Sequence, residues 1–418
     1  MTRTKVFQQT FQDIPLSAPN KSDEQTWSLL IRAVNDHHKV HRIGRPDSFN
    51  TLAQVLLSLY NLGADSGKMN HIYCSMAAGL EPIRTGSIRL TTANWRVHLG
   101  KRESVFYADK KSSFLYRDYV DFFDGEIDAN GLNSVFQTYF PSLLDGCLGS
   151  HVLAITHVAF GMENSLSNMV SEGLAQICTT FLDVGDLLIT QPKMNLGCDE
   201  VLDMIRCDQR FQGRLSAVFV NSLRALLCNR RDLLKLYMEC MHPAHHNNLD
   251  AKNEAKELVI LASKLIQVPT LRRPSLDTPP ASPPLNGVTK CAQSSNCQLG
   301  GALLSSALAI ERILPHLKSP DDIAKLLNLQ RLSTICTYII QGKPLLQYTY
   351  QIPQRTWEDC RQAILASDDT RTAIIFNDLD AAQKLTTNNT THYLCIANML
   401  SDAANYSKSW RETVFTSK

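Results

Sequence analysis

The chain has 418 residues, of which 44% are hydrophobic and 20% are charged. This balance is typical of a globular protein with a large buried core, and it excludes disorder along most of the chain. The formal net charge is only +2, so there is no overall electrostatic reason to expect nucleic acid or an acidic membrane as a partner.

The N-terminal residues contain no apolar stretch of signal-peptide length, and no later apolar run approaches the roughly 18 residues that cross a bilayer. The 12 cysteines are scattered, with no CxxC pair. In a chain of this length we expect reduced thiols, because a large core needs no disulfides. The sequence therefore predicts a cytoplasmic protein with no membrane partner.

Residues 1–21 are predicted to be an extended N-terminal arm, because two prolines discourage helix formation. A helical pattern begins at residue 22. The stretch 36–48, DHHKVHRIGRPDS, is interpreted as a polar loop between helices. Its Asp36, His37, His38 and His41 are residue types that bind metals, but the basic residues around them favour a solvated loop.

Further apolar residues at helical spacing predict a helix over 49–64, ended by Gly63, and another over 131–144. Between them, aromatic residues recur at three- and four-residue spacing. They are Tyr116, Tyr119, Phe122 and Phe123. This stripe is interpreted as core, with a substrate-binding wall as the alternative.

The most informative stretch is 143–185, in which Gly146 and Gly149 break the chain before a long apolar helix that carries His157. A second helix follows and contains the tetrapeptide Glu172-Gly-Leu-Ala. Several more amphipathic helices are predicted over 196–268.

Residues 269–301 are rich in proline and serine and are predicted to be a flexible insertion, because they cannot bury enough apolar surface to fold. Ser275 follows two arginines, and Thr278 and Ser282 each precede a proline, so a kinase acting on these residues is a candidate partner. A phosphate there would add a charge of about −1.5 to −2.

Helical patterns resume over 302–418 and include His392. We therefore expect an all-α fold with a single large multi-helix domain, formed by 22–268 and 302–418 and interrupted by one disordered insertion.

Several segments are similar to motifs of the questin oxidase-like family. They are LLSLYNLGAD at 56–65, HVAFGME at 157–163, EGLA at 172–175, ALAIERILPHL at 307–317 and THYLCI at 391–396. The resemblance implies a helical monooxygenase that carries out Baeyer–Villiger oxidation of an aromatic or polyketide ketone. It also implies non-haem iron held by histidines, with NADPH as the reductant.

The chain departs from the family pattern at several of its histidines. These positions hold Thr51, Gln54, Val55, Leu153 and Leu303, and a family lysine falls on Ile396. His157 and His392 keep the family identity, so the resemblance makes these two the predicted metal ligands. A third ligand would have to be recruited, with Glu163 and Cys395 as candidates.

The sequence contains no glycine-rich nucleotide-binding motif, so a Rossmann-type site for NADPH is not indicated. Two functions remain open. One is an oxidoreductase of questin oxidase type, and the other is a catalytically inactive helical binding or scaffold protein regulated through phosphorylation of the insertion.

Overall fold

The computed structural model describes residues 24–43, 49–80, 82–83, 86, 88–100, 114–150, 152–188, 192–211, 219–242, 248–266, 287–346, 353–386 and 389–405. Within these ranges the chain forms α-helices α1–α16 and 3-10 helices η1–η4, with two isolated β-bridges and no sheet. The prediction of an all-α fold is confirmed. None of the described helices is both long and apolar enough to cross a membrane.

The elements of the first half are α1 (Glu24–Val40), α2 (Leu52–Asn61), α3 (Ser66–Ala77), η1 (Trp95–His98), α4 (Phe114–Asn130), α5 (Leu132–Tyr139), η2 (Pro141–Ser150), α6 (Leu153–Glu163), α7 (Ser167–Thr180) and α8 (Gly185–Leu188). Those of the second half are α9 (Cys198–Cys207), η3 (Gln209–Phe211), α10 (Phe219–Cys240), α11 (Asn248–Lys264), α12 (Gly287–Ile313), η4 (Leu314–His316), α13 (Pro320–Ile340), α14 (Trp357–Ala366), α15 (Thr370–Leu385) and α16 (Thr390–Asn405).

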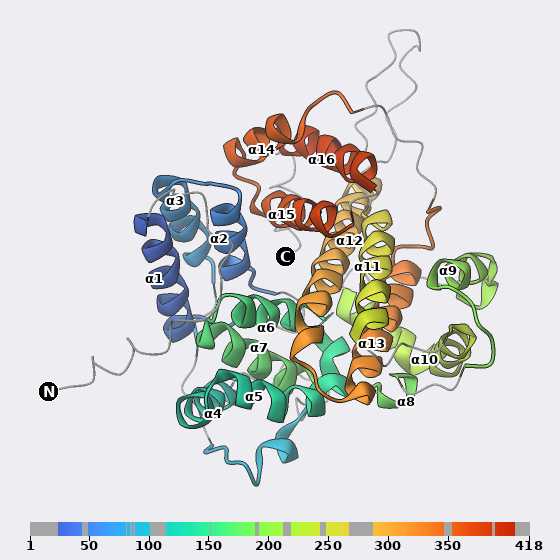
Figure 1. Cartoon of the computed structure of the whole chain (residues 1–418), viewed down its shortest axis with the longest axis horizontal. Coiled ribbons are helices and arrows are strands. Elements are labelled where there is room, and N and C mark those ends of the chain that lie inside the picture. Colours follow the sequence, from blue (N-terminus) through green and yellow to red (C-terminus); the bar gives the residue numbers. More distant parts are fainter. Residues whose placement is uncertain are drawn as a thin grey trace, which may run out of the picture.

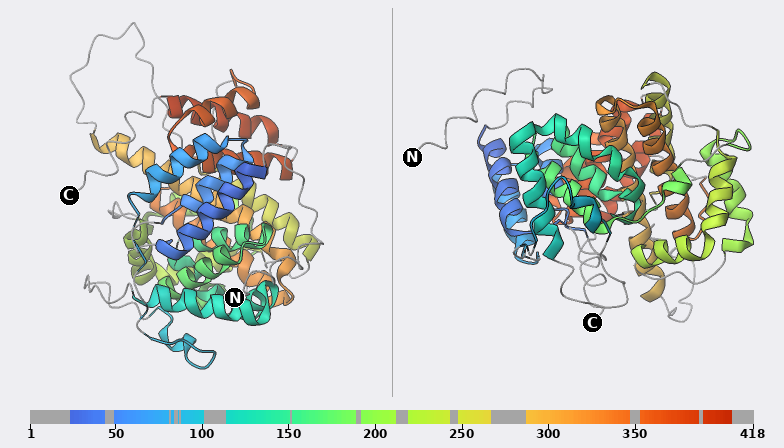
Figure 2. Two further views of the ribbon diagram at one scale, coloured as in Figure 1. Left: turned by 90° about the vertical axis from the view of Figure 1, so that its left-hand side faces the viewer. Right: turned by 90° about the horizontal axis from the view of Figure 1, so that it is seen from below.

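Three groups of helices surround a central set (Figure 1). α1–α3 lie on one side, α8–α10 on the opposite side, and α14–α16 cover one end. In the centre, α6 packs against α7 and α12, and α12 also packs against α11, α13 and α15. Seen from its left-hand side, the molecule has the blue helices α1–α3 in front of the central helices (Figure 2, left).

The central helices are buried on nearly all sides. Every residue of α6 from Ala154 to Met162 is buried, as is every residue of α7 from Met169 to Thr180. Helices that are enclosed in this way need no polar face, which explains why α6 reads as a nearly continuous apolar run. The predicted aromatic core of α4 is also confirmed, because Tyr116, Tyr119 and Phe123 are almost fully buried.

Two glycines allow α6 and α7 to approach closely. A Cβ added to Gly173 on α7 would lie 2.5 Å from Cγ2 of Val158, and one added to Gly161 on α6 would lie 2.6 Å from Cγ2 of Val170. Both distances are too short for real carbon atoms. The close packing of these helices therefore depends on the missing side chains and brings His157 opposite Glu172.

The interpretation of 36–48 as a loop was wrong at its start. α1 continues to Val40, and His37 and His38 are buried in its last turns. The physical reason is periodicity. The buried face of α1 continues at three- and four-residue spacing through Leu30, Val34, His37 and His38. The helix therefore extends into a stretch whose basic residues had favoured a loop.

The insertion is shorter at its C-terminal end than the predicted range of 269–301. α12 already begins at Gly287, in a stretch that contains no proline. Ser275, Thr278 and Ser282 lie outside the described residues, as does the predicted arm over 1–21.

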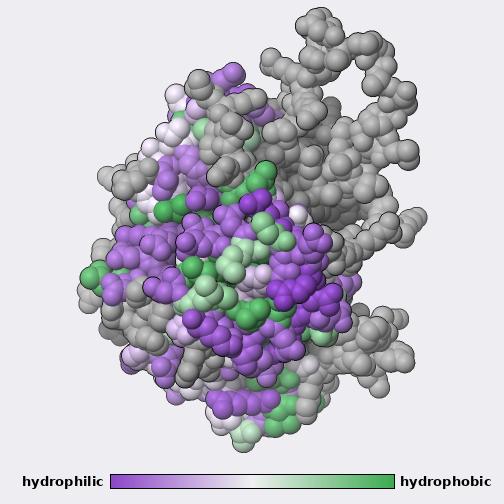
Figure 3. All heavy atoms as spheres, turned by 90° about the vertical axis from the view of Figure 1, so that its right-hand side faces the viewer, coloured by the Kyte–Doolittle hydropathy of each residue, from purple (hydrophilic) through white to green (hydrophobic). Residues whose placement is uncertain are grey.

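The face that carries α9 and α10 is mostly hydrophilic, with separate hydrophobic areas between the charged ones (Figure 3). Exposed apolar side chains on these elements include Met204 of α9 and Leu236 of α10. Such scattered exposure is ordinary for a protein surface.

Candidate functional site

Glu172 is the centre of a buried polar cluster. Its side chain is only 1% exposed, because it lies on the enclosed helix α7. His157 of α6 places Nε2 2.7 Å from Oε2 of Glu172. His38 of α1 places Nδ1 3.1 Å from Oε1, and Nδ1 of the neighbouring His37 lies 3.5 Å from the same oxygen. Three imidazoles from two helices therefore surround one carboxylate.

His38 connects this carboxylate to a second one. Its Nε2 lies 2.9 Å from Oδ2 of Asp124 on α4, whose side chain is about one-third exposed. Burial by itself lowers the pKa of His38, but the hydrogen bonds to Asp124 and Glu172 outweigh it and raise the pKa to about 9. His38 is therefore an imidazolium at neutral pH and donates a hydrogen bond to each carboxylate.

Glu172 stays ionised in spite of its burial. Desolvation favours a raised pKa, but the hydrogen bonds from His157, His37 and His38 together hold the pKa of Glu172 well below its ordinary range. An ionised carboxylate can only accept hydrogen bonds. Each imidazole nitrogen that faces it must therefore carry a hydrogen.

This requirement selects one tautomer of His157 in its neutral form. When Nε2 donates to Glu172, Nδ1 of a neutral ring keeps a lone pair. Nδ1 is buried and has no hydrogen-bond partner in the described part of the chain. An imidazole whose other nitrogen is held by a carboxylate is the usual arrangement of a catalytic base or of a metal ligand.

His37 is also held from two sides. Nδ2 of Asn50 donates to its Nε2 at 2.6 Å, so the hydrogen of the neutral ring lies on Nδ1, which faces Glu172. The same amide group of Asn50 donates to the backbone oxygen of Arg42 at 3.0 Å. Asn50 thereby links His37, in the last turn of α1, to Arg42 just after that helix.

The wall beside His157 is mainly apolar. The ring of Phe49 meets the imidazole edge to face, with centroids 6.4 Å apart. One residue before His157, Thr156 accepts a hydrogen bond from Nε2 of Gln54 at 2.6 Å. This contact ties α2 to α6.

The other predicted metal ligand, His392 of α16, belongs to a different group of contacts. Its Nε2 lies 2.7 Å from Oγ of Ser263 on α11, and its ring meets that of Tyr393. Burial lowers the pKa of His392 to about 4, with a smaller contribution from Lys264. His392 is therefore neutral at physiological pH.

The two candidate third ligands lie on different helices, Glu163 at the end of α6 and Cys395 on α16. Glu163 forms an ion pair with Arg312 at 3.4 Å and is about half exposed, and Cys395 is buried on α16. Positions where the family has histidine or lysine are filled by core residues. Leu303 is fully buried and Ile396 is 1% exposed.

These contacts do not fit the iron site that the resemblance implies. Among the residues that the structure describes, no three His, Cys, Asp or Glu side chains form a group suited to a metal ion. Nε2 of His157 and Oε2 of Glu172 are hydrogen-bonded to each other, which leaves Nδ1 as the nitrogen of His157 that could bind a metal. Of the two predicted metal ligands, His157 lies in the polar cluster around Glu172, and His392 is hydrogen-bonded to Ser263.

The sequence did not indicate four members of the cluster as site residues. Glu172 stands out only as the start of a family motif, His37 and His38 fall in the stretch interpreted as a loop, and Asp124 carries no signal of its own. One signal was available. Glu172 is the only charged residue in the α7 sequence SNMVSEGLAQICTT, and a lone charge in an enclosed helix must find partners.

The fold and the cluster define an all-helical protein whose buried carboxylate orients an imidazole with a free nitrogen. The family model described as Questin oxidase-like matches residues 49–274, which is more than half of the chain. The protein therefore belongs to the questin oxidase-like family, a family of oxidoreductases. No curated protein matches the chain.

Proposed function

We propose that the protein is an oxygen-dependent oxidoreductase that carries out a Baeyer–Villiger oxidation of an aromatic or polyketide ketone. In this reaction one atom of O₂ enters between the carbonyl carbon and its ring neighbour, and the other leaves as water. NADPH supplies the two electrons that the second oxygen atom requires and becomes NADP⁺, with one proton taken up.

The observation that carries this proposal is the buried pair of His157 and Glu172. Glu172 fixes the ring, and Nδ1 of His157 keeps a lone pair with no partner among the described residues. Such a nitrogen accepts a proton from a phenolic hydroxyl, a common substituent of polyketide rings. The phenolate that results is more electron-rich and reacts more readily with an oxidant.

The test is oxygen uptake by the full-length protein with NADPH and a hydroxylated anthraquinone-type ketone. We expect His157→Ala to lower the rate by about 100-fold or more, which is the usual contribution of a positioned base. His71→Ala is the matched control, because His71 on α3 has a 64% exposed side chain and lies outside the cluster. Equal rates in wild type and His157→Ala would contradict the proposal.

Metal content of the same samples tests the iron that the resemblance implies. Iron at close to one equivalent, lost in both His157→Ala and His392→Ala, would support a shared site that these two residues form. Iron that persists in both variants would exclude His157 and His392 as its ligands. The proposed role of His157 as a base would then not involve the metal.

A second function is favoured by the residues at the family's histidine positions. Leu303 and Ile396 contribute to the apolar core there, and Gln54 bonds Thr156. The replacement of these polar residues by core residues favours a helical binding or scaffold protein regulated by a kinase acting on Ser275, Thr278 or Ser282. Absence of oxygen uptake with every aromatic ketone and with NADPH would select this alternative.

A further inference from the structure

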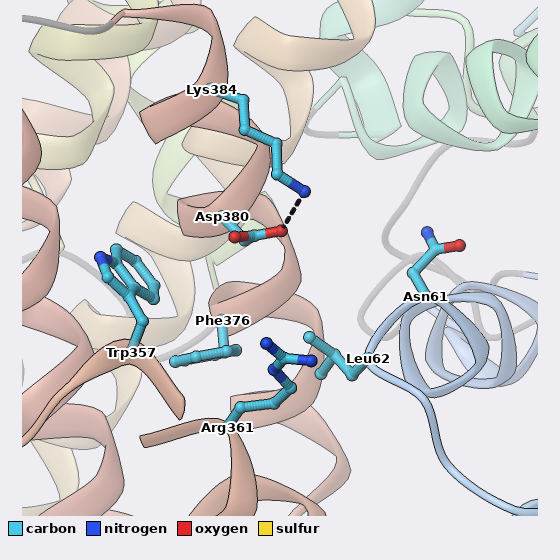
Figure 4. A pocket seen from close by; sticks show the side chains of 7 residues that line it. All are labelled: Asn61, Leu62, Trp357, Arg361, Phe376, Asp380 and Lys384. Atoms are coloured by element: carbon cyan, nitrogen blue, oxygen red, sulfur yellow. Dashed lines mark hydrogen bonds and ion pairs between the residues drawn. The ribbon is translucent and has the colours of Figure 1, made fainter. Parts of the chain in front are cut away.

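A cavity of about 300 Å³ lies where the C-terminal end of α2 meets α14 and α15 (Figure 4). It is separate from the histidine cluster. Gln54, which contacts the helix of His157, lies in the first turn of α2, whereas Asn61 and Leu62 line the cavity at the other end. Since each helical residue adds about 1.5 Å, the two ends of α2 are about 14 Å apart.

Two aromatic side chains form one wall of this cavity. Trp357 of α14 and Phe376 of α15 meet edge to face, with ring centroids 5.3 Å apart and an interplanar angle of 62°. Phe376 is 2% exposed and therefore fixed in the core, while Trp357 is only partly buried. The indole thus offers a supported aromatic surface to a ligand.

The charged lining has an excess of positive charge. It consists of Arg361, Lys384 and Asp380, which gives two cations and one anion. Lys384 pairs with Asp380 at 2.7 Å, so that pair is already neutralised (Figure 4). Arg361 pairs with Glu358 at 2.6 Å, but both side chains are about half exposed and Glu358 does not line the cavity. Surface pairs of this kind are weak, so Arg361 can change partner at little cost.

We propose that this cavity binds a small aromatic carboxylate, with its ring against Trp357 and its carboxylate on the guanidinium of Arg361. A guanidinium recognises a carboxylate through two parallel hydrogen bonds. The cavity volume is at the lower end of the range for ligand sites, which limits the ligand to one or two fused rings. This site is additional to the proposed oxidation and does not depend on it.

Isothermal titration calorimetry of the full-length protein with 1-naphthoate tests the proposal. We expect saturable binding of one molecule per chain. Arg361→Gln is expected to weaken it about tenfold, because a charge-assisted bidentate contact is lost. Arg355→Gln is the matched control, since Arg355 pairs with Asp402 at 2.6 Å and does not line the cavity. Its affinity for 1-naphthoate should equal that of the wild type.

Two further measurements separate the contribution of the ligand's carboxylate to binding from that of its aromatic ring. 1-Naphthalenemethanol, which has the same rings without the carboxylate, should bind about tenfold more weakly than 1-naphthoate. Trp357→Leu should weaken both ligands, with the helical content checked by circular dichroism. No saturable binding of 1-naphthoate at millimolar concentration would overturn the proposal. Binding that is as tight in Arg361→Gln as in wild type would overturn it as well.

Discussion

At the residue scale, the cluster around Glu172 is a balance between burial and pairing. A carboxylate that is 1% exposed would normally be protonated, but His157 and His38 are hydrogen-bonded to its two oxygens and Nδ1 of His37 lies 3.5 Å from one of them. One of these imidazoles, His38, brings a full positive charge and shares it with Asp124. Removing any member therefore affects the protonation of the others.

The first residue-scale prediction concerns Glu172→Gln. The amide has the same size, but it leaves the charge of His38 without its buried partner and can accept through only one oxygen. We expect the free energy of unfolding to fall by about 3 to 5 kcal/mol, as for other broken buried pairs. Urea denaturation followed by circular dichroism measures it.

The matched control for this substitution is Glu163→Gln. Glu163 forms its ion pair with Arg312 at the surface, where its side chain is 47% exposed. Its loss should change the stability by no more than about 0.5 kcal/mol. Equal effects of the two substitutions would show that Glu172 is not paired as described.

The second residue-scale prediction concerns pH. The pKa of His38 rises from 6.5 to about 9 on folding, so its contribution to stability is fully present below pH 6.5 and is lost as the pH rises through 9. The loss is at most about 3 to 4 kcal/mol, because each pKa unit corresponds to about 1.4 kcal/mol. Urea denaturation at pH 6, 7.5 and 9 should show this decline in wild type but not in His38→Gln. An equal decline in both proteins would assign it to other groups.

At the element scale, the position of the cluster follows from how closely α6 and α7 pack. The family motif Glu172-Gly-Leu-Ala has a physical meaning here, because Gly173 removes the side chain that would separate the two helices. The sequence predicted both helices and singled out His157 as a site residue. It did not predict how closely α6 and α7 cross, since the space available at a glycine depends on the partner helix.

The element-scale prediction compares two helical glycines. Gly173→Ala should destabilise the protein, because the new Cβ would lie 2.5 Å from Val158 Cγ2 and 3.1 Å from the backbone oxygen of Ala154. Gly125→Ala on α4 should instead stabilise it by about 0.5 to 1 kcal/mol, since no atom lies within 4 Å and alanine favours helix. Thermal unfolding of both variants measures the difference, and the same sign for both would contradict this packing.

At the scale of the whole molecule, the second half of the chain completes the core of the first. α12 packs against α6, which carries His157, and α13 packs against η2 and α8, so helices beyond residue 287 cover elements of the first half of the chain. The family match ends at residue 274. The folded unit therefore extends past the matched range.

The sequence predicted the fold class of the whole molecule but not the contacts between distant helices. Periodicity predicted the all-helical class because burial on one face leaves a regular pattern. It could not predict that His37 and His38 of α1 meet Glu172 of α7, since a contact over 134 residues, as between His38 and Glu172, depends on the packing of whole helices. Nor could it predict the cavity, whose lining comes from α2, α14 and α15.

α2 gives the two sites a common support, because Gln54 holds the residue before His157 while Leu62 lines the cavity. Thermodynamic linkage makes such a connection reciprocal. A ligand whose binding shifts α2 would change the affinity of the His157 site by a certain factor, and occupancy of the His157 site would change the affinity of that ligand by the same factor. A rigid α2 with no such shift would leave the two sites independent, so the motion of this one helix determines whether the protein can act as an allosteric switch.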